Sequence, residues 1–279
     1  MENKNDLVNV VMATYHGDSA HNLQQAVDSI LKQTHSNFEL ILTIDGPVPE
    51  ERAALLKEIE SSDNRILLLW NTVNKGPGAA RNAAIKIAKG KYIAIFDSDD
   101  IAFPDKLENQ LSYLQKECLD LVGSFYIEFD NDIQSGKEIR PLPIDNSAIK
   151  NAIAFYNPIA NPTVFAKAEV FKQFGYYEKY RFGEDYALWI KLLKNGINMG
   201  NCPFPTIYFR RGSAFINRRR GIKIAKTDFL NKLSSSSLYP FYLKPKIWLL
   251  AIATFLARLL PSGLFNYIRN LRHKKNMNQ

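Results

Sequence analysis

The run Tyr92-Ile-Ala-Ile-Phe-Asp97-Ser98-Asp99-Asp100 leads from an apolar strand directly into three carboxylates. Folding alone does not favour that arrangement, because like charges at the end of a buried strand repel one another. Side chains two residues apart on an extended chain point the same way, so Asp97 and Asp99 can present oxygen atoms together while Asp100 points the other way. Mg²⁺ and Mn²⁺ bind such oxygen atoms, Mg²⁺ through one or two carboxylates plus substrate phosphates. The run therefore predicts either a site for a cation and a phosphate or a polar turn of capping aspartates.

The segments around this run alternate between short apolar stretches and stretches of helical periodicity. Strands separated by helices of about ten to fifteen residues are typical of right-handed crossovers and parallel pairing. We therefore predict an α/β fold with a mainly parallel sheet and helices on both faces. The predicted strands cover residues 8–14, 38–44, 65–70, 92–96 and 119–129, and the predicted helices lie at about 23–31, 49–62, 78–89 and 104–116.

In open sheets of this kind, ligands bind outside the carboxyl ends of the strands. Thr14 and Tyr15 end the first predicted strand, Asp45 ends the second, and Asp97 and Asp99 end the fourth. We expect these side chains to share one edge of the sheet, where the carboxylates require a cationic partner. This placement favours a functional role for Asp97 and Asp99. Asp45 also suits an ordinary turn, because Gly and Pro follow it.

The loop Gly76-Pro-Gly-Ala-Ala-Arg81-Asn82 joins the third strand to a helix, so its backbone amides could face an anion at the helix N-terminus. It is not a dinucleotide fingerprint, because Arg81 stands where a small residue is required and the loop does not follow the first strand. A P-loop is excluded because no Gly-Lys-Ser/Thr ending is present. Arg81 is either a surface residue on a tight connection or a group that orients an aspartate or a diphosphate.

Composition limits the classes of protein. The chain has 279 residues and a net charge of +8, which suits one sizeable domain with an appendage or two small domains. Its two cysteines, Cys118 and Cys202, are far apart, and its four histidines are scattered, so neither a disulfide framework nor a zinc or histidine metal centre is expected. The polar N-terminus lacks the apolar core of a secretory signal. We expect a cytoplasmic protein.

A second acidic pair opens the segment Glu184-Asp185-Tyr186-Ala-Leu188-Trp189, which has an amphipathic helical pattern. Acids in the first turn of a helix complement the helix dipole, and this structural role is an alternative to catalysis. In this sequence the Glu184-Asp185 pair is accompanied by the acidic strand end and the glycine loop. We therefore favour the interpretation that the three motifs form one site.

Together these motifs resemble family 2 glycosyltransferases of the GT-A fold, over residues 8–217. The resemblance implies a Rossmann-like glycosyltransferase domain at residues 1–217, with a nucleotide-binding half (1–130) and an acceptor-binding half (131–217). The matching segments are Ala13-Thr14-Tyr15, Ser29 to Thr34, Asp45-Gly46, Gly76 to Asn82, Phe96 to Asp100, and Glu184-Asp185-Tyr186 with Trp189.

The resemblance also assigns roles to residues. It places Asp97 and Asp99 at the motif that holds Mn²⁺ or Mg²⁺ on the donor diphosphate, and Asp185, beside Glu184, at the general base. The sequence departs from the family at the motif matched to the nucleotide base of the donor. After the second strand the family has two acids and a serine, and here only Asp45-Gly46 remains. The positions matched to nucleotide-sugar binding are Thr14, Tyr15, Asp45, Gly76, Arg81, Asp97 and Ser98.

The C-terminal region, residues 218–279, is basic and predicted to form amphipathic helices. Its apolar stretch at 247–260 is interrupted by Arg258 and is shorter than the roughly 20 residues that span a bilayer. Aromatic residues alternating with Lys and Arg are typical of a helix lying on an anionic membrane surface. A helix buried within the domain is the alternative. We expect peripheral association with the inner face of the cell membrane.

The predicted function is an inverting, metal-dependent transfer of sugar from a nucleoside diphosphate, with UDP favoured, to a saccharide acceptor. A lipid-linked acceptor in surface polysaccharide synthesis fits the membrane prediction. The alternatives are a nucleotidyltransferase and a non-enzymatic basic protein that binds membrane or nucleic acid. Nucleic acid is not expected as a partner, because the aspartate-rich sheet edge would repel it.

Overall fold

The computed structural model describes residues 6–130, 132–136, 138–175, 182–211 and 221–260. In the first part of the chain, strands and helices alternate as predicted, and each predicted boundary lies within about three residues of the observed one. The elements are β1 (Val8–Thr14), α1 (Ala20–Leu31), β2 (Phe38–Asp45), α2 (Glu50–Ser62), β3 (Ile66–Asn71), α3 (Pro77–Ile87), β4 (Tyr92–Asp97), β5 (Ile101–Ala102), α4 (Lys106–Lys116) and β6 (Leu121–Phe129).

The second part of the described chain adds the helix predicted to open at Glu184 and two helices in the C-terminal region predicted to be helical, together with strands and short helices that periodicity did not predict. They complete the sheet and carry the second acidic pair. These elements are β7 (Glu138–Arg140), α5 (Asn146–Ala152), β8 (Phe165–Lys167), α6 (Ala168–Phe174), α7 (Glu184–Lys194), β9 (Met199–Arg210), α9 (Ile222–Ser235) and α10 (Lys244–Leu259).

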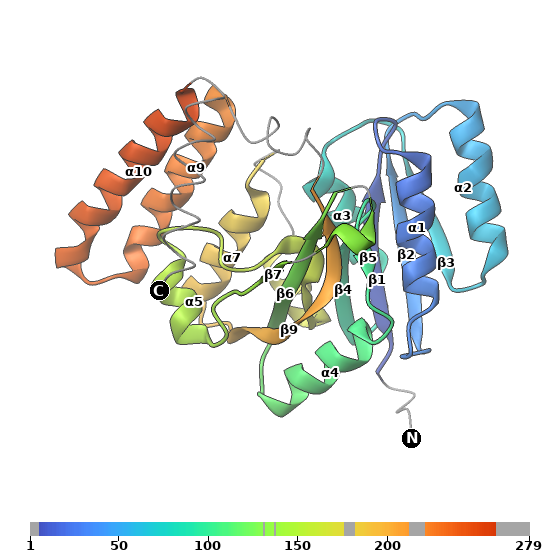
Figure 1. The fold of residues 1–279 in the computed structure, drawn as a ribbon, viewed down its shortest axis with the longest axis horizontal. Coiled ribbons are helices and arrows are strands. Elements are labelled where there is room, and N and C mark those ends of the chain that lie inside the picture. The colour runs from blue at the N-terminus through green and yellow to red at the C-terminus, as the bar shows by residue number, and fades with distance from the viewer. Residues whose placement is uncertain (1–5, 131, 137, 176–181, 212–220, 261–279) are drawn as a thin grey trace. The chain divides into compact units, whose positions relative to one another are not determined.

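The strands form one sheet, drawn in Figure 1, with the order β3-β2-β1-β4-β8-β6-β9-β5, and β7 pairs with β6. β3, β2, β1 and β4 are parallel neighbours, and β6 is parallel to β9. The short β8 lies antiparallel between β4 and β6, so these two strands still run in the same direction. The prediction of a mainly parallel sheet is confirmed.

Both faces of the sheet are covered by helices. Alternate residues of β1, β2 and β4, such as Val10, Leu42 and Phe96, are buried in one cluster with apolar side chains of α1, α2 and α4. The intervening residues, such as Val11 and Ile41, are also buried, and α3 packs against β1 and β2. Strands buried on both faces are typical of parallel α/β sheets. The core therefore fixes the carboxyl ends of β1, β2 and β4 side by side.

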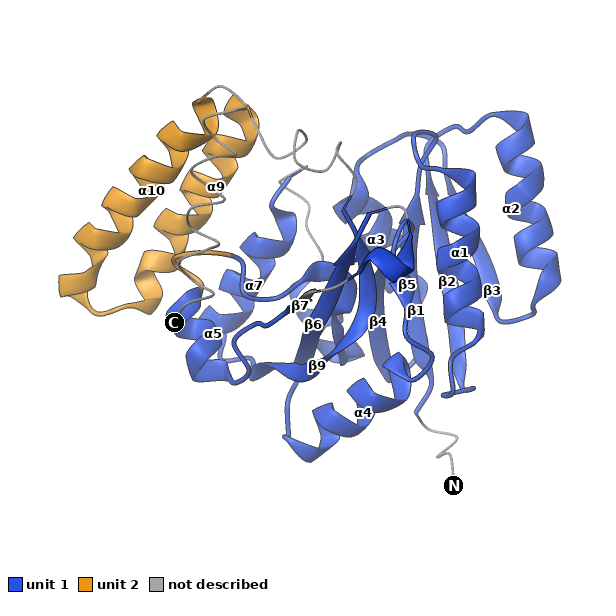
Figure 2. Ribbon diagram, viewed as in Figure 1, with its two compact units in different colours: residues 1–152, 157–211 blue, residues 153–156, 212–279 orange. Residues whose placement is uncertain are grey.

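The chain divides into two compact units, which Figure 2 distinguishes by colour. Unit 1 comprises residues 1–152 and 157–211 and contains the sheet; unit 2 comprises residues 153–156 and 212–279. Within the described residues of unit 2, α9 and α10 pack against each other. The predicted domain boundary at 217–218 falls outside the described residues. None of the helices in the described ranges has the length and apolarity needed to cross a membrane.

Candidate active site

The side chain of Arg81 brings the two predicted acidic motifs together. Its Nη2 donates a hydrogen bond to Oδ1 of Asp97 at 2.5 Å, and its Nη1 lies 3.5 Å from Oε1 of Glu184. The Arg81 side chain is only 8% exposed, so the alternative of a surface arginine on a tight connection is wrong. A buried guanidinium between β4 and α7 places a fixed positive charge at the carboxyl edge of the sheet.

Asp185 follows Glu184 in the first turn of α7. Gly183 precedes the helix in the left-handed conformation, with φ of 68°, which a residue without Cβ adopts at no steric cost. The Asp185 Oδ2 accepts a hydrogen bond of 2.8 Å from Nδ2 of Asn157, and Oδ1 accepts one of 2.8 Å from the amide of Tyr186. Asn157 was not predicted as a site residue, since in sequence it appears only as an ordinary Asn-Pro turn dipeptide.

Burial and neighbouring charge raise the pKa of Glu184 to about 7. Burial is the larger cause, and the charge of Asp185 adds to it, while Arg81 opposes the rise. The charge of Asp97 also raises this pKa. The acids around Arg81 therefore carry more negative charge than its guanidinium balances, and the site favours a proton or a further cation.

Asp45, at the end of β2, holds the loop that precedes α3. Its Oδ1 accepts a hydrogen bond from the amide of Lys75 at 3.0 Å, and its Oδ2 accepts one from the amide of Gly76 at 2.8 Å. The residue is only 4% exposed. The anion that this loop faces is thus the Asp45 side chain itself, and Gly76, with φ of 93°, adopts a backbone conformation that suits glycine.

Asp18 joins the ends of β1 and β4. Its Oδ2 accepts hydrogen bonds from Oγ1 of Thr14 (3.0 Å), the amide of Tyr15 (3.2 Å) and Oγ of Ser98 (2.9 Å). Burial raises the pKa of Asp18, although these hydrogen bonds favour its ionised form. Three predicted donor-binding residues therefore meet at one carboxylate that was not predicted, because Gly17-Asp18-Ser19 reads as a turn followed by a helix cap.

The remaining acids of the strand end differ in exposure. Asp97 has a side chain that is 27% exposed, and Asp99 is half-buried. Asp100 is 1% exposed, and its Oδ1 accepts a hydrogen bond of 2.8 Å from the amide of Arg210. Burial, followed by the charge of Asp99, raises the pKa of Asp100 well above its usual value. Asp100 therefore anchors the end of β9, and Asp97 and Asp99 are the acids that solvent reaches.

Comparison with known proteins identifies the family. The sequence profile described as "Glycosyl transferase family 2" matches residues 9–186. The chain belongs to this family. It is 34% identical over 216 residues to the UDP-Glc:alpha-D-GlcNAc-diphosphoundecaprenol beta-1,3-glucosyltransferase WfgD of Escherichia coli, covering 77% of this chain and 81% of that protein. It is 30% identical over 224 residues to the amylovoran biosynthesis glycosyltransferase AmsE of Erwinia amylovora, covering 80% and 83%.

Solved structures confirm the GT-A fold of this glycosyltransferase. TarS 1–349 of S. aureus, in complex with UDP-GlcNAc, matches with a TM-score of 0.64 and 17% identity over 90% of this chain and 72% of that one. The mannosyltransferase PcManGT of Pyrobaculum calidifontis, in complex with GDP-Man and Mn²⁺, matches with a TM-score of 0.64 and 15% identity, covering 95% and 79%.

The carboxylate oxygens at the end of β4 are suitable ligands for a hard divalent cation. Asp97 and Asp99 offer carboxylate oxygens at a partly exposed strand end, and Arg81 engages one oxygen of Asp97. No group of three or more metal-binding side chains lies within the described residues of the transferase. An ion here would thus depend on a ligand for further oxygen atoms, which is how Mg²⁺ is held by one or two carboxylates plus substrate phosphates.

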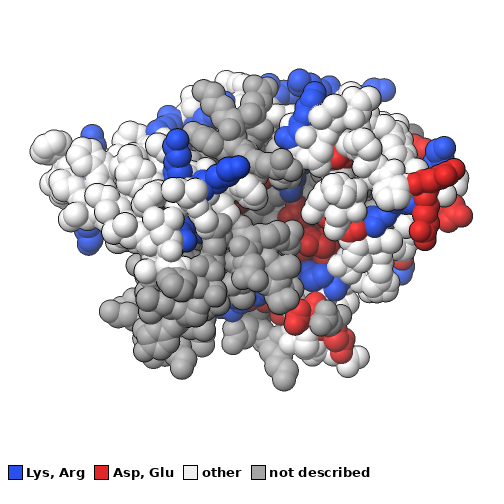
Figure 3. Space-filling view, turned by 90° about the horizontal axis from the view of Figure 1, so that it is seen from above, with Lys and Arg blue, Asp and Glu red and all other residues white. Residues whose placement is uncertain are grey.

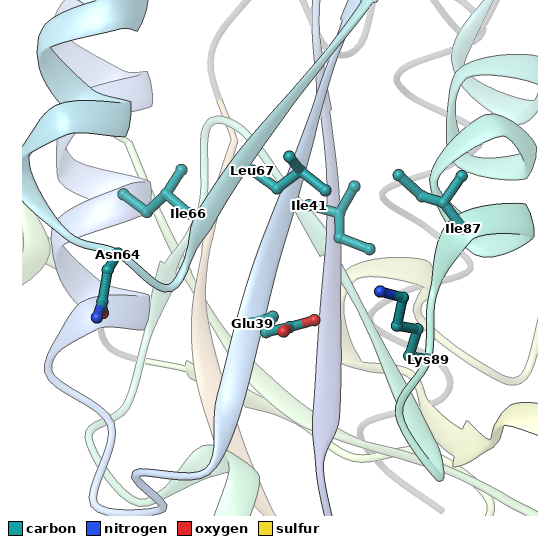
Figure 4. A pocket seen from close by; sticks show the side chains of 7 residues that line it. All are labelled: Glu39, Ile41, Asn64, Ile66, Leu67, Ile87 and Lys89. Atoms are coloured by element: carbon teal, nitrogen blue, oxygen red, sulfur yellow. The ribbon is translucent and has the colours of Figure 1, made fainter.

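The distribution of acidic side chains on the surface agrees with this placement. Figure 3 looks onto the edge where the parallel strands end and shows acidic side chains gathered there. A separate cavity of about 370 Å³ lies at the other end of β2 and β3, as Figure 4 shows, and contains none of the predicted site residues. It is lined by Glu39, Ile41, Asn64, Ile66, Leu67, Ile87 and Lys89.

Proposed function

We propose that this glycosyltransferase moves a sugar from a nucleoside diphosphate to a hydroxyl group of a saccharide, with inversion at the anomeric carbon. The observation that supports this most directly is the Arg81 bridge, which puts the partly exposed Asp97 and the Glu184–Asp185 pair in one site. A sugar donor and an acceptor must meet at such a junction for transfer to occur in a single displacement.

The donor nucleotide is proposed to bind over the ends of β1 and β2. Thr14, Tyr15 and Asp45 would surround the base and ribose of the nucleotide. The amide of Gly76 would hold Asp45 in place, and the hydroxyl of Ser98 would hold Asp18, through the hydrogen bonds described above. Arg81 would lie near the diphosphate. UDP is the proposed carrier, supported by the name of WfgD and by the UDP-GlcNAc complex of TarS.

The metal is proposed to be Mn²⁺ or Mg²⁺, held by Asp99 and by the Asp97 oxygen that does not bind Arg81. Such an ion, when bound, acts as a Lewis acid on phosphoryl oxygens. The protein's own contribution is to hold these carboxylates at the strand end, through the β4 register and through the hydrogen bond of Arg210 Nε to the carbonyl of Asp99 at 2.7 Å.

Asp185 is proposed as the general base that takes the proton of the acceptor hydroxyl. Asn157 orients its carboxylate through a hydrogen bond of 2.8 Å, and Glu184 beside it remains partly protonated near neutrality. With one general base and no protein nucleophile, the acceptor oxygen displaces the nucleoside diphosphate from the sugar in one step, which inverts the anomeric carbon. Inverting glycoside hydrolases follow the same rule, with water as the attacking group.

The proposed acceptor is a lipid-linked saccharide, and the proposed place of work is the cytoplasmic face of the cell membrane. Two relatives support this: WfgD is named for a diphosphoundecaprenol-linked substrate, and AmsE is named for amylovoran biosynthesis. The function would thus be a step in the synthesis of O-antigen, capsule or exopolysaccharide.

The test is a panel of nucleotide sugars incubated with the protein and Mn²⁺. We expect slow release of nucleoside diphosphate from one donor, its loss on chelation, and faster release when a matching acceptor is added. Release of pyrophosphate from a nucleoside triphosphate and a sugar phosphate would instead identify a nucleotidyltransferase. No turnover with any donor or acceptor would favour a binding protein, and a product that retains the donor's anomeric configuration would contradict inversion.

A further inference from the structure

The outward face of α10 in unit 2 is apolar and exposed to solvent. At about 100° per residue, its exposed apolar side chains fall within an arc of about 100°. The exposed fractions are 49% for Trp248, 68% for Leu249, 47% for Ile252, 57% for Leu256 and 46% for Leu259. A contiguous exposed apolar surface of this kind marks an interaction site more often than chance, whereas single exposed apolar residues do not.

The face of α10 beside this arc already has a partner. Ile247 and Ala251 are buried, and the ring of Phe255 lies 5.9 Å from the ring of Phe229 in α9 in an edge-to-face arrangement. Figure 2 shows α9 and α10 side by side within unit 2. The helix therefore carries further apolar side chains beside those that pack against α9. Of these, Trp248 also contacts unit 2, through a hydrogen bond of 3.4 Å from its Nε1 to Oγ of Ser236.

The charges of unit 2 identify the kind of partner. Its described residues include six Lys or Arg residues and one acid, Asp228. That acid is paired with Lys232 and Arg258, each at 3.3 Å, so its charge is neutralised between α9 and α10. Lys244 and Lys246, at the start of α10, lie on either side of the apolar arc at this helical spacing. A second copy of the unit would bring like charges together, whereas an anionic surface would complement them.

The segment before α10 adds the aromatic residues that are typical of a membrane interface. Phe241 is 84% exposed and Tyr242 is 75% exposed, shortly before Lys244. Aromatic rings next to lysines suit the headgroup level of a bilayer, where the ring enters the apolar layer and the ammonium group remains among the phosphates. With 16 residues, α10 is too short to span a bilayer, so a position in the plane of the surface fits its length.

We propose that the outward face of α10, together with Phe241 and Tyr242, docks into the surface of an anionic lipid bilayer. The proposal deepens the proposed function, on which it rests for the choice of a lipid-linked acceptor. Docking would keep the transferase at the surface where such an acceptor is anchored, which raises the local concentration of acceptor without a new contact at the active site.

The test is co-sedimentation of the full chain with vesicles of phosphatidylglycerol and phosphatidylethanolamine, in comparison with phosphatidylcholine alone. We expect binding to the anionic vesicles, a weakening in about 1 M salt, where the screening length is about 3 Å, and at least about a tenfold loss in the double variant Leu249→Glu and Ile252→Glu. The matched control is Leu67→Glu in unit 1, whose side chain has the same 47% exposure as that of Ile252. This control should bind as the wild type does.

A second readout is independent of whether the double variant folds. Trp248 fluorescence should shift to shorter wavelength when anionic vesicles are added, and Trp248→Phe should lose that shift. Absence of binding, or equal binding by the double variant, would overturn the proposal, as would a wild-type dimer that the double variant abolishes without any vesicle binding. Donor hydrolysis is measured on the same samples without lipid, so an active enzyme that ignores vesicles refutes docking alone, and a vesicle-binding protein without hydrolysis refutes the proposed function alone.

Discussion

The acids at the ends of β1 and β2 and the acids where β4 meets α7 lie along the same sheet edge but are held differently. Asp18 and Asp45 accept hydrogen bonds from hydroxyl groups and backbone amides, which are neutral donors close to the strand ends. Asp97 and Glu184 instead share the guanidinium of Arg81. We call these two regions the neutral-donor region and the Arg81 region.

The difference indicates which region responds to ligands. Carboxylates satisfied by amides and hydroxyls fix loops in place, and their surroundings need not change when a donor binds. In the Arg81 region the charges of Asp185 and Asp97 raise the pKa of Glu184. Adding a cation or removing a proton therefore changes the electrostatic energy of all these acids together. We expect the loss of turnover to be larger for changes in the Arg81 region than for changes in the neutral-donor region.

The largest effect is expected for Asp185→Asn. Asn157 and the Tyr186 amide donate to different oxygens of Asp185, so the single oxygen of the new amide can accept only one of these hydrogen bonds. The amide cannot take the proton of the acceptor hydroxyl, so the turnover number should fall by about 10²–10⁴-fold. Donor affinity, measured by calorimetry, should change little. Wild-type turnover in this variant would remove Asp185 from the mechanism, and a large loss of donor affinity would show that Asp185 binds donor rather than activating acceptor.

A change at Arg81 separates its charge from its shape. Arg81→Met leaves two acids facing each other without the guanidinium, and breaking a buried pair in this way costs about 3–5 kcal/mol of unfolding free energy. Arg81→Lys keeps the charge but cannot donate to two carboxylates in a fork, so it should keep most of the stability and lose turnover. Urea unfolding and donor hydrolysis test both variants. Equal activity of the Arg81→Lys variant and the wild-type protein would mean that charge alone suffices.

Much of the fold was predictable because periodicity is local. The alternation from β1 to α4 depends on short apolar runs and helical repeats, which one sequence displays directly. β8 has only three residues, and β9 contains Pro203 and Pro205 and pairs with β6 through register shifts, so neither shows a clear period. These strands depend on tertiary pairing, which one sequence does not reveal.

The site was predictable where motifs carry chemistry and unpredictable where one side chain merely supports another. Asp97, Asp99 and Asp185 stand in recognisable motifs, and the structure brings Asp97 close to the start of α7 through Arg81. The contact of Asp18 with Ser98 joins residues 80 positions apart, and that of Asn157 with Asp185 joins residues 28 positions apart. Contacts of this kind follow from the fold and not from local composition.

Glu184 should make the stability of the Arg81 region depend on pH up to about 7. The folded protein holds the Glu184 proton up to a pKa of about 7, whereas the unfolded chain releases it near 4.5, so the folded state binds more protons between these values. Stability from this group is present below pH 4.5 and is lost as the pH rises through about 7. Since one pKa unit corresponds to about 1.4 kcal/mol, Glu184→Gln should gain roughly 3 kcal/mol over the wild type at pH 8 and almost nothing at pH 4.5.

The measurement is urea unfolding of both proteins at several pH values, with a chelator present so that no cation changes the charge of the site. A difference between the wild type and the Glu184→Gln variant that does not grow with pH would mean that the surroundings of Glu184 in the Arg81 region do not raise its pKa.

The smallest effect is expected in the neutral-donor region, from Asp18. Asp18→Ala leaves the hydroxyls of Thr14 and Ser98 and the amide of Tyr15 without their shared acceptor, which should cost about 2 kcal/mol of unfolding free energy. Asp18→Asn is the matched control, because its side-chain oxygen can accept the same three bonds without a charge, so it should cost less than about 1 kcal/mol.

Urea unfolding measures the stability of both Asp18 variants, and donor hydrolysis measures their kinetics. The KM for donor should rise a few-fold in the alanine variant only, because the ends of β1 and β4 lose their connection when the shared acceptor is removed. If Asp18→Asn lost as much turnover as Asp185→Asn, Asp18 would act by its charge, and the two regions would not differ in kind.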